Sequence, residues 1–337
     1  MVRDRRDIAA SSARQCSVAG AKISRDTLSI QSLPTWAKLE VKASRGKGTE
    51  AVDARFWLIQ AFNGISYGAL LFLVGSGLSL IFGVMRIVNL SHGSYFLLGG
   101  YVALSVIWTT GSWLLAIPVA AVTVALIGLV MERVFLRPLG FDPLRQVLLT
   151  VGFAFLFQQA ALDIWTGNPF DINPPAVLTQ TIVVGGLHLP LYRIFMIGVA
   201  LFIGLTLWLV MEKTRLGATI RATVDDAEMA RGVGIDTSYI SMLIFALGAF
   251  LAALGGVIGG AFLGVYPGLD FEMLPIAFAV VIIGGMGSLG GAAIGALIVG
   301  LADNFGKALF PEISYFTLYA PMALILAVKP TGLFGRE

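Results

Sequence analysis

The sequence predicts an all-α polytopic membrane protein with eight to nine transmembrane helices, some of them Gly-rich and broken. Hydrophobic residues make up 57% of the chain and charged residues 13%, whereas soluble domains carry about 25% charged residues. From residue 56 onward, apolar runs long enough to cross a bilayer follow one another. One compact charged segment, residues 212–237, interrupts them. An unpaired charge in hydrocarbon is costly, so this segment is expected to lie outside the membrane.

Residues 1–55 differ in composition from the rest of the chain. They carry eleven Lys or Arg and six Asp or Glu, a net charge of +5, against −2 for the remaining residues. Low hydrophobicity with this charge predicts a disordered basic tail. The tail has a single aromatic residue, Trp36, so its basic residues are not regularly interleaved with aromatic ones. It also has no nucleic-acid-binding module, so no nucleic-acid partner is expected. The chain therefore divides into the tail, 1–55, and a transmembrane domain, 56–337.

Nine apolar runs follow in the transmembrane domain. They span residues 56–82, 91–109, 113–131, 146–165, 191–211, 238–262, 273–290, 291–310 and 314–328. Glycines interrupt the pair within 273–310, which is expected either as two full crossings or as half-helices. Between the runs lie polar loops, and the loop at 166–189 contains a β-prone stretch at 181–184.

Basic residues predict the orientation of the chain. With the charged segment placed inside, the inside loops after residue 55 carry ten Lys or Arg and the outside loops carry two. The positive-inside rule therefore places residues 212–237 in the cytoplasm. The same orientation puts the basic tail outside, against the rule. Either the tail is not translated or the first crossing is misassigned.

The charged segment has the signals of a short helix. Thr223 followed by Asp226 fits the capping-box pattern, a hydroxyl three residues before an acid. Acidic residues in the first turn and Arg231 in the last turn match the helix dipole, and Gly232 and Gly234 offer left-handed stops. We therefore expect one helix at 224–232, with Ala227, Met229 and Ala230 available to dock on a partner. The alternative is an ordinary solvated loop.

Glycines recur with a spacing of four on three runs. One set is Gly64 and Gly68, the second is Gly256, Gly260 and Gly264, and the third is Gly287, Gly291 and Gly295. This spacing places small residues on one helix face, where the backbones of two helices can approach closely. Close helix packing is the expected role. A glycine-lined wall would also leave room for a solute.

Polar residues gather where the first run breaks and the second begins. They are Asn89, Ser91, His92, Ser94 and Tyr95. Polar groups within a membrane are costly and point to function, and a helix N-terminus offers free N–H groups to a carboxylate. A solute path is one interpretation, and simple capping of the helix is the other. Asp270 and Glu272 are expected at the outer surface, where a binding protein could meet them.

Enzymatic templates are absent. Residues 64–68 match GxSxG only within an apolar helix, rather than at a strand-to-helix turn. The chain has no full phosphate-binding loop and no HExxH motif. Its single cysteine, Cys16, excludes an internal disulfide and a CxxC metal or redox site. We therefore expect no catalytic residues, no bound metal and no cofactor.

Several spaced motifs resemble one family. The stretch GATIRATVDDAEMARGVGID at 217–236 resembles the cytoplasmic coupling loop of the permease subunits of branched-chain amino-acid ABC importers. Similar motifs stand in the same order at 89–103 (NLSHGSYFLLGGYVA), 132–139 (ERVFLRPL), 284–300 (GGMGSLGGAAIGALIVG) and 330–336 (PTGLFGR). The resemblance covers about residues 56–336. Residues from Val52 resemble the family's own beginning, which favours a start codon there and an untranslated tail.

The resemblance implies a function and a set of partners. The chain would be a multi-pass permease subunit of the bacterial inner membrane and would form the path with a second related permease. Two cytoplasmic ATP-binding subunits would hydrolyse ATP, and a periplasmic or extracellular binding protein would deliver the solute. The segment that couples to the ATPases would comprise Arg221, Thr223, Asp225, Asp226, Glu228, Met229, Arg231 and Gly234.

Two alternatives stay open. The family also imports urea, short amides and aromatic acids, and the sequence does not separate these solutes. A function of another class is an ATP-independent secondary carrier or channel. Such a protein has no use for a docked cytoplasmic helix, and this chain has no series of ionisable residues across the membrane.

Overall fold

A computed structural model describes the chain from Thr35 to Gly335, apart from Phe141, with side chains described from Ala54 onward, apart from Tyr315. The chain divides into two compact units, Met1–Ala54 and Arg55–Glu337. Most of the tail predicted to be disordered, residues 1–34, lies outside the described part. The helix α2 already begins at Thr35, within that predicted tail, and runs to Met85. No proline follows residue 34 in this stretch, so nothing breaks the helix there.

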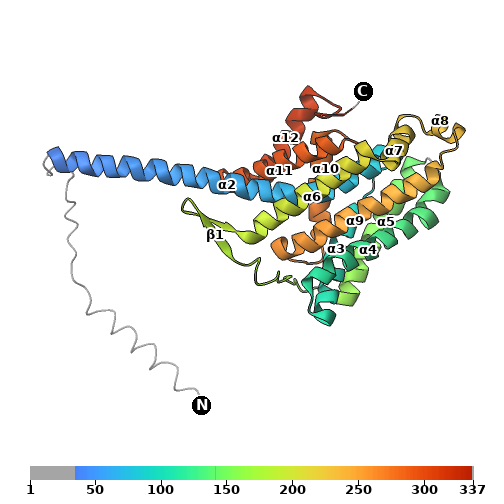
Figure 1. Cartoon of the computed structure of the whole chain (residues 1–337), viewed down its shortest axis with the longest axis horizontal. Helices are drawn as coiled ribbons and strands as arrows, with labels where there is room; N and C mark the ends of the chain where they lie inside the picture. Colours follow the sequence, from blue (N-terminus) through green and yellow to red (C-terminus); the bar gives the residue numbers. More distant parts are fainter. Residues whose placement is uncertain (1–34, 141, 336–337) are drawn as a thin grey trace, which may run out of the picture. The chain divides into compact units, whose positions relative to one another are not determined.

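The second unit is built almost entirely of helices (Figure 1). After α2 come α3 (His92–Thr110), α4 (Trp113–Met131), η2 (Glu132–Leu136), η3 (Arg137–Leu139), α5 (Pro143–Trp165), α6 (Leu191–Lys213), α7 (Arg215–Asp225), α8 (Ala227–Gly232), α9 (Thr237–Leu263), α10 (Leu269–Gly284), α11 (Leu289–Leu309), η4 (Pro311–Ile313) and α12 (Ser314–Val328). The prediction of a mainly helical, polytopic membrane protein is confirmed.

Six helices of the described part are long and apolar enough to cross a membrane. They are Ala54–Met85, Trp113–Leu139, Pro143–Trp165, Leu191–Lys213, Thr237–Leu263 and Leu289–Leu309, and Phe316–Val328 is a shorter apolar helix. The remaining two helices of the predicted set, α3 and α10, are largely buried inside the unit. An interior helix faces protein rather than lipid and can therefore be more polar or shorter. The count of eight to nine crossings stays a prediction.

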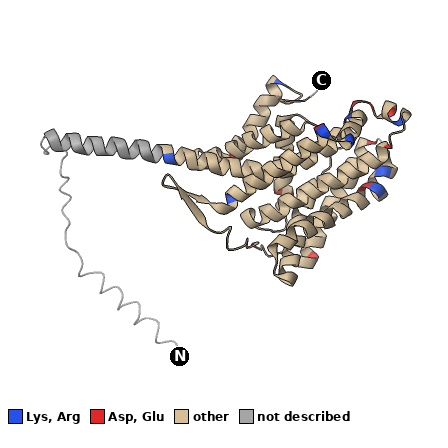
Figure 2. Cartoon of the chain, viewed as in Figure 1, with Lys and Arg blue, Asp and Glu red and all other residues tan. Residues whose placement is uncertain are grey.

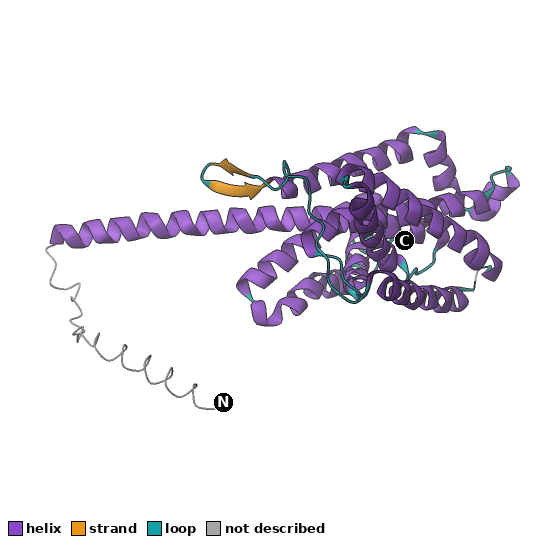
Figure 3. Cartoon of the chain, turned by 90° about the horizontal axis from the view of Figure 1, so that it is seen from below, coloured by secondary structure: helices purple, strands orange, loops and turns teal. Residues whose placement is uncertain are grey.

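The one strand pair in the described residues is a hairpin between α5 and α6 (Figure 3). Strand β1 (Thr181–Val184), at the β-prone stretch, pairs antiparallel with β2 (Leu187–Pro190), with Val184 opposite Leu187. Gly185 and Gly186 join the strands with φ angles of +59° and +80°. A two-residue turn with both φ angles positive matches the twist of a hairpin.

The helix α3 lies at the centre of the unit and packs against α4, α9 and α10. Its residues from His92 to Tyr101 are all buried. A Cβ atom added at Gly256 would collide with the carbonyl oxygen of Phe96, and one at Gly99 would collide with the backbone of Ala253. The backbones of α3 and α9 are therefore in direct contact, which only glycine permits at these positions.

Other glycines bring α11 against two neighbours. Gly64 and Gly68 of α2 face Gly300 and Ala296 of α11, and Gly291 and Gly295 of α11 face the backbone of α10. Gly260 lies against Ile172 and Val265. Two glycines do not share the helix face that was predicted for them. Gly287 was grouped with Gly291 and Gly295, and Gly264 was grouped with Gly256 and Gly260. Both have positive φ, +82° and +79°, so they lie in turns next to the helix ends.

Candidate functional site

Charged residues gather at the end of the unit that carries α7 and α8 (Figure 2). The helix α7 packs against α6 and α9, so it lies against two membrane helices. The Arg221 guanidinium donates to the carbonyl oxygen of Met211 in α6. Arg221 therefore ties α7 to α6.

The charged segment forms two helices with a corner at Asp226, rather than one helix at 224–232. Asp226 has extended backbone, with φ −152° and ψ 100°, and caps α8. Its Oδ1 accepts hydrogen bonds from the N–H groups of Glu228 and Met229, each at 2.9 Å. The predicted cap at Thr223 is wrong, because its hydroxyl donates to the carbonyl of Thr219 inside α7 at 2.9 Å.

Two large apolar side chains, at α8 and its C-cap, are exposed among charged residues. Met229 is 66% exposed and Val233 72%, whereas Ala230 is buried against the rest of the segment. Arg231 lies in the last turn and donates from Nε to the carbonyl of Ala227 at 3.2 Å. Gly234 has φ +89°, as expected of a left-handed stop. Asp225 ends α7, so only Asp226 to Gly234 belong to the protruding helix and its ends.

The five polar residues at the start of α3 lie together in the interior. Asn89, Ser91, His92, Ser94 and Tyr95 are each at most 1% exposed. The Asn89 Oδ1 accepts hydrogen bonds from the Ser91 N–H at 3.1 Å and the Ser91 hydroxyl at 2.7 Å. His92 Nε2 lies 3.0 Å from the carbonyl oxygen of Val74 in α2. The cluster is therefore closed to solvent in this conformation.

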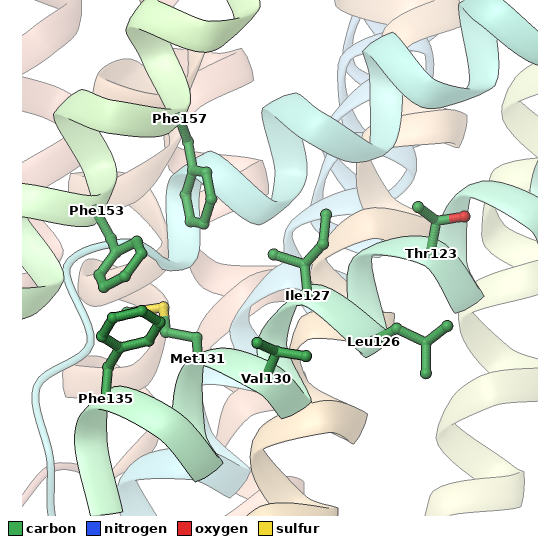
Figure 4. Close-up of a pocket in the computed structure, with 8 residues that line it drawn as sticks. All are labelled: Thr123, Leu126, Ile127, Val130, Met131, Phe135, Phe153 and Phe157. Carbon is green, nitrogen blue, oxygen red and sulfur yellow. The ribbon is translucent and has the colours of Figure 1, made fainter. Parts of the chain in front are cut away.

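Tyr95 is the member of this cluster that lies next to an open groove between α4 and α5. The Tyr95 hydroxyl donates to the Met131 sulfur at 2.9 Å, and its ring lies 6.1 Å from the ring of Phe157. Met131 and Phe157 also line the groove (Figure 4). Its volume is about 360 Å³, and its other lining residues are Thr123, Leu126, Ile127, Val130, Phe135 and Phe153. The groove is apolar, as a lipid-facing surface is.

Asp270 is the polar residue that the sequence analysis misplaced. It was expected on the outer surface, but it is 2% exposed. It lies in the first turn of α10, and the Ser94 hydroxyl donates to its Oδ2 at 3.1 Å. Glu272, two residues on, is exposed and accepts a hydrogen bond from the Tyr266 hydroxyl at 2.8 Å. The sequence did contain a hint of this burial. Gly264 and Gly268 precede Asp270, and both have positive φ angles in the segment where the chain turns from α9 into α10.

The helices and the site together define a polytopic membrane permease. The sequence profile of the family described as "Branched-chain amino acid transport system / permease component" matches residues 60–326. This match covers most of the chain, which therefore belongs to that family.

Named relatives agree with this assignment. The chain is 31% identical over 297 residues to the high-affinity branched-chain amino acid transport system permease protein LivH of Escherichia coli K12, covering 83% of this chain and 96% of LivH. It is 29% identical to BraD of Pseudomonas aeruginosa, with the same coverage. The autoinducer 2 import system permease protein LsrC of Escherichia coli O9:H4 is 30% identical over 199 residues, 56% of either chain. No solved structure matches significantly.

Proposed function

We propose that this chain is a permease subunit of an ATP-driven importer of branched-chain or related hydrophobic amino acids in a bacterial inner membrane. It forms the translocation path with a second related permease. A binding protein delivers the amino acid, and two ATP-binding subunits supply the energy. The family membership and the long match to LivH support this assignment.

The observation that carries the proposal is the exposed α8. This helix presents Met229 to solvent, and its C-cap residue Val233 is exposed next to it, which suits a partner with an apolar groove. In the proposed complex α8 docks in a groove of one ATP-binding subunit. Since α8 is followed almost directly by α9, movement of the groove displaces a helix that contacts the centre of the permease.

The names of the relatives support the choice of solute. LivH and BraD are named for branched-chain amino acids, whereas LsrC is named for autoinducer 2 and matches a smaller part of the chain. Longer coverage at similar identity favours the amino acids. Urea, short amides and aromatic acids are the other solutes to be tested.

The experiment is an affinity purification of the chain from native membranes, followed by mass spectrometry and by uptake in liposomes with ATP inside. We expect a second permease and ATP-binding subunits to accompany it, and L-leucine uptake to require ATP. A chain that purifies alone and still moves L-leucine would contradict the proposal and favour an ATP-independent carrier.

A matched pair of variants tests α8 itself. Met229→Asp places a charge in the proposed contact and should release the ATP-binding subunits. Val177→Asp is the control, because Val177 is also 66% exposed but lies in the loop before the β-hairpin. Equal loss of the subunits in both variants, or retention in both, would show that α8 is not the docking element.

A further inference from the structure

Asp270 is a carboxylate held deep in the membrane domain. Its neighbour Ser94 lies in the first turn of α3, and His92 in the same turn contacts the carbonyl of Val74. Val74 belongs to the apolar span Ala54–Met85 and stands well inside it. The first turn of α3 therefore lies beside the interior of this span rather than beside its end, and Asp270 lies next to that turn.

The carboxylate of Asp270 is only partly satisfied. Its Oδ2 accepts from Ser94, while its Oδ1 has no hydrogen-bond partner among the described residues. The position of Asp270 in the first turn of α10 compensates the helix dipole but leaves this oxygen unused. A buried ionisable group in a membrane is costly and marks a functional site by default.

The other buried carboxylates of the described part stand beside basic residues. Asp303 is 3% exposed and pairs with Lys307 at 2.8 Å. Glu132 also has a buried oxygen without a hydrogen-bond partner and forms no ion pair among the described residues, but the charges of Arg137 and Arg133 act on it. Asp270 has no Lys or Arg within several residues on either side, and no ion pair of the described residues includes it. The cation that would complete this site is therefore absent from the described part of the chain.

A polar stripe on α3 leads to Asp270. Ser94, Tyr101 and Ser105 are spaced by seven and four residues, which places them on one helix face. The Tyr101 hydroxyl is buried and has no partner among the described residues. Trp165, at the end of α5, stacks on the Tyr101 ring at 5.0 Å and donates to the Ser105 hydroxyl at 2.7 Å. The stripe thus runs from the end of α3 to its first turn, under Trp165.

We propose that Asp270, supported by Ser94, receives the ammonium group of the solute as it crosses the membrane. An ammonium group has three donors and a positive charge, which the free Oδ1 and the neighbouring hydroxyls can accept. This inference rests on the proposed import function and narrows its substrates to solutes that carry an ammonium group. Urea and aromatic acids without an amine do not fit this site. Since Asp270 is buried, the solute reaches it when α5 or α10 has moved away from α3.

The test compares two isosteric variants of the full importer in liposomes, with L-leucine uptake, ATP hydrolysis and thermal melting as readouts. Asp270→Asn keeps the size and the acceptor for Ser94 but removes the charge, so uptake of L-leucine should fall about tenfold or more. Asp303→Asn is the control, because Asp303 is equally buried but already paired, and uptake should stay within about twofold. Both complexes should melt as the wild type does.

Each outcome decides the inference. Wild-type uptake by Asp270→Asn would overturn it. If the Asp270→Asn complex fails to assemble, Ser94→Ala, which removes one hydroxyl, is tested instead. Uptake that falls several-fold in an assembled Ser94→Ala complex supports the site. Unchanged uptake refutes it. A wild-type importer that moves urea or 4-methylpentanoate, which is leucine's skeleton without the amine, as fast as L-leucine also refutes it. A wild-type complex that moves no L-leucine at all refutes the proposed function instead.

Discussion

At the scale of single residues, glycines decide how closely the helices approach. Gly291 faces the backbone of Gly284 so closely that an added Cβ atom would collide with its carbonyl group. Gly290, its neighbour in the same turn of α11, has no atom within 4 Å of such a Cβ position. The two positions share chain context and differ only in the space available, so they form a natural pair for mutation.

We predict that Gly291→Ala destabilises the protein by about 1–3 kcal/mol, the usual cost of overpacking. Gly290→Ala should leave stability within about 0.5 kcal/mol of the wild type, or raise it slightly, because alanine favours helix. Thermal melting of the detergent-purified chain checks both. Equal melting temperatures for the two variants would show that α10 and α11 separate easily.

A second prediction concerns the hydroxyl of Tyr95. Tyr95→Phe removes the hydrogen bond to the Met131 sulfur and leaves the aromatic packing against Phe157 and Phe245 in place. The expected loss of stability is about 1 kcal/mol. Tyr95→Leu should cost more, because it also removes the ring contacts. Melting curves that rank the two variants in the opposite order would show that the hydroxyl, rather than the ring, holds this position.

At the scale of elements, the corner between α7 and α8 depends on one carboxylate. Asp226→Ala removes the acceptor for the N–H groups of Glu228 and Met229, and a lost N-cap costs about 0.5–2 kcal/mol. We predict that hydrogen exchange of these two amides becomes faster and that ATP-driven uptake falls. Thr223→Val should leave their exchange unchanged, because Thr223 bonds only within α7. Faster exchange in the Thr223 variant would restore the sequence-based cap.

The same element shows what the sequence could and could not predict. Acidic residues before Met229, Arg231 in the last turn and Gly234 as a stop were enough to predict a short helix. They were not enough to choose its cap, because Thr223 and Asp226 both have suitable side chains. Only the backbone decides: α7 continues through Thr223, and the chain first becomes extended at Asp226. Periodicity carries no information on where one helix ends and the next begins.

For the interior helices, the sequence predicted where the helices lie along the chain but not what surrounds them. Apolar runs predicted α3 and α10, but a run does not reveal whether its helix faces lipid or protein. The outward placement of Asp270 failed for this reason, since its burial depends on the chain folding back at Gly264 and Gly268, two positions with positive φ. The contact between Ser94 and Asp270 joins residues 176 positions apart, a separation at which one sequence gives no signal.

At the scale of the whole molecule, the division at Ala54 and Arg55 separates the first unit from the permease domain. The family profile begins at residue 60, and a start at Val52 stays a hypothesis. We predict that a variant lacking residues 1–51 inserts in the membrane, binds its partners and takes up L-leucine as the full chain does.

Intact-mass measurement of the native protein is the companion experiment. A mass that begins near residue 52 would support the later start, and a mass that includes residues 1–51 would refute it. If the shortened variant inserts poorly, the first unit has a role in membrane insertion, and the orientation predicted from basic residues has to be revised.

The unbroken length of α9 has a mechanical consequence. Its 27 residues form a rod of about 40 Å at 1.5 Å per residue, and one end of this rod follows α8 after only a few residues. The glycine face of α9 contacts the backbone of α3 directly. No flexible side chain lies between the two helices at this contact, so a displacement of α9 is passed on to α3. A tilt of about five degrees about the α8 end therefore shifts the far end by roughly 3–4 Å. The helix α9 thus converts a small rotation at the charged end of the molecule into a displacement, along its own length, that is larger than the length of a covalent bond.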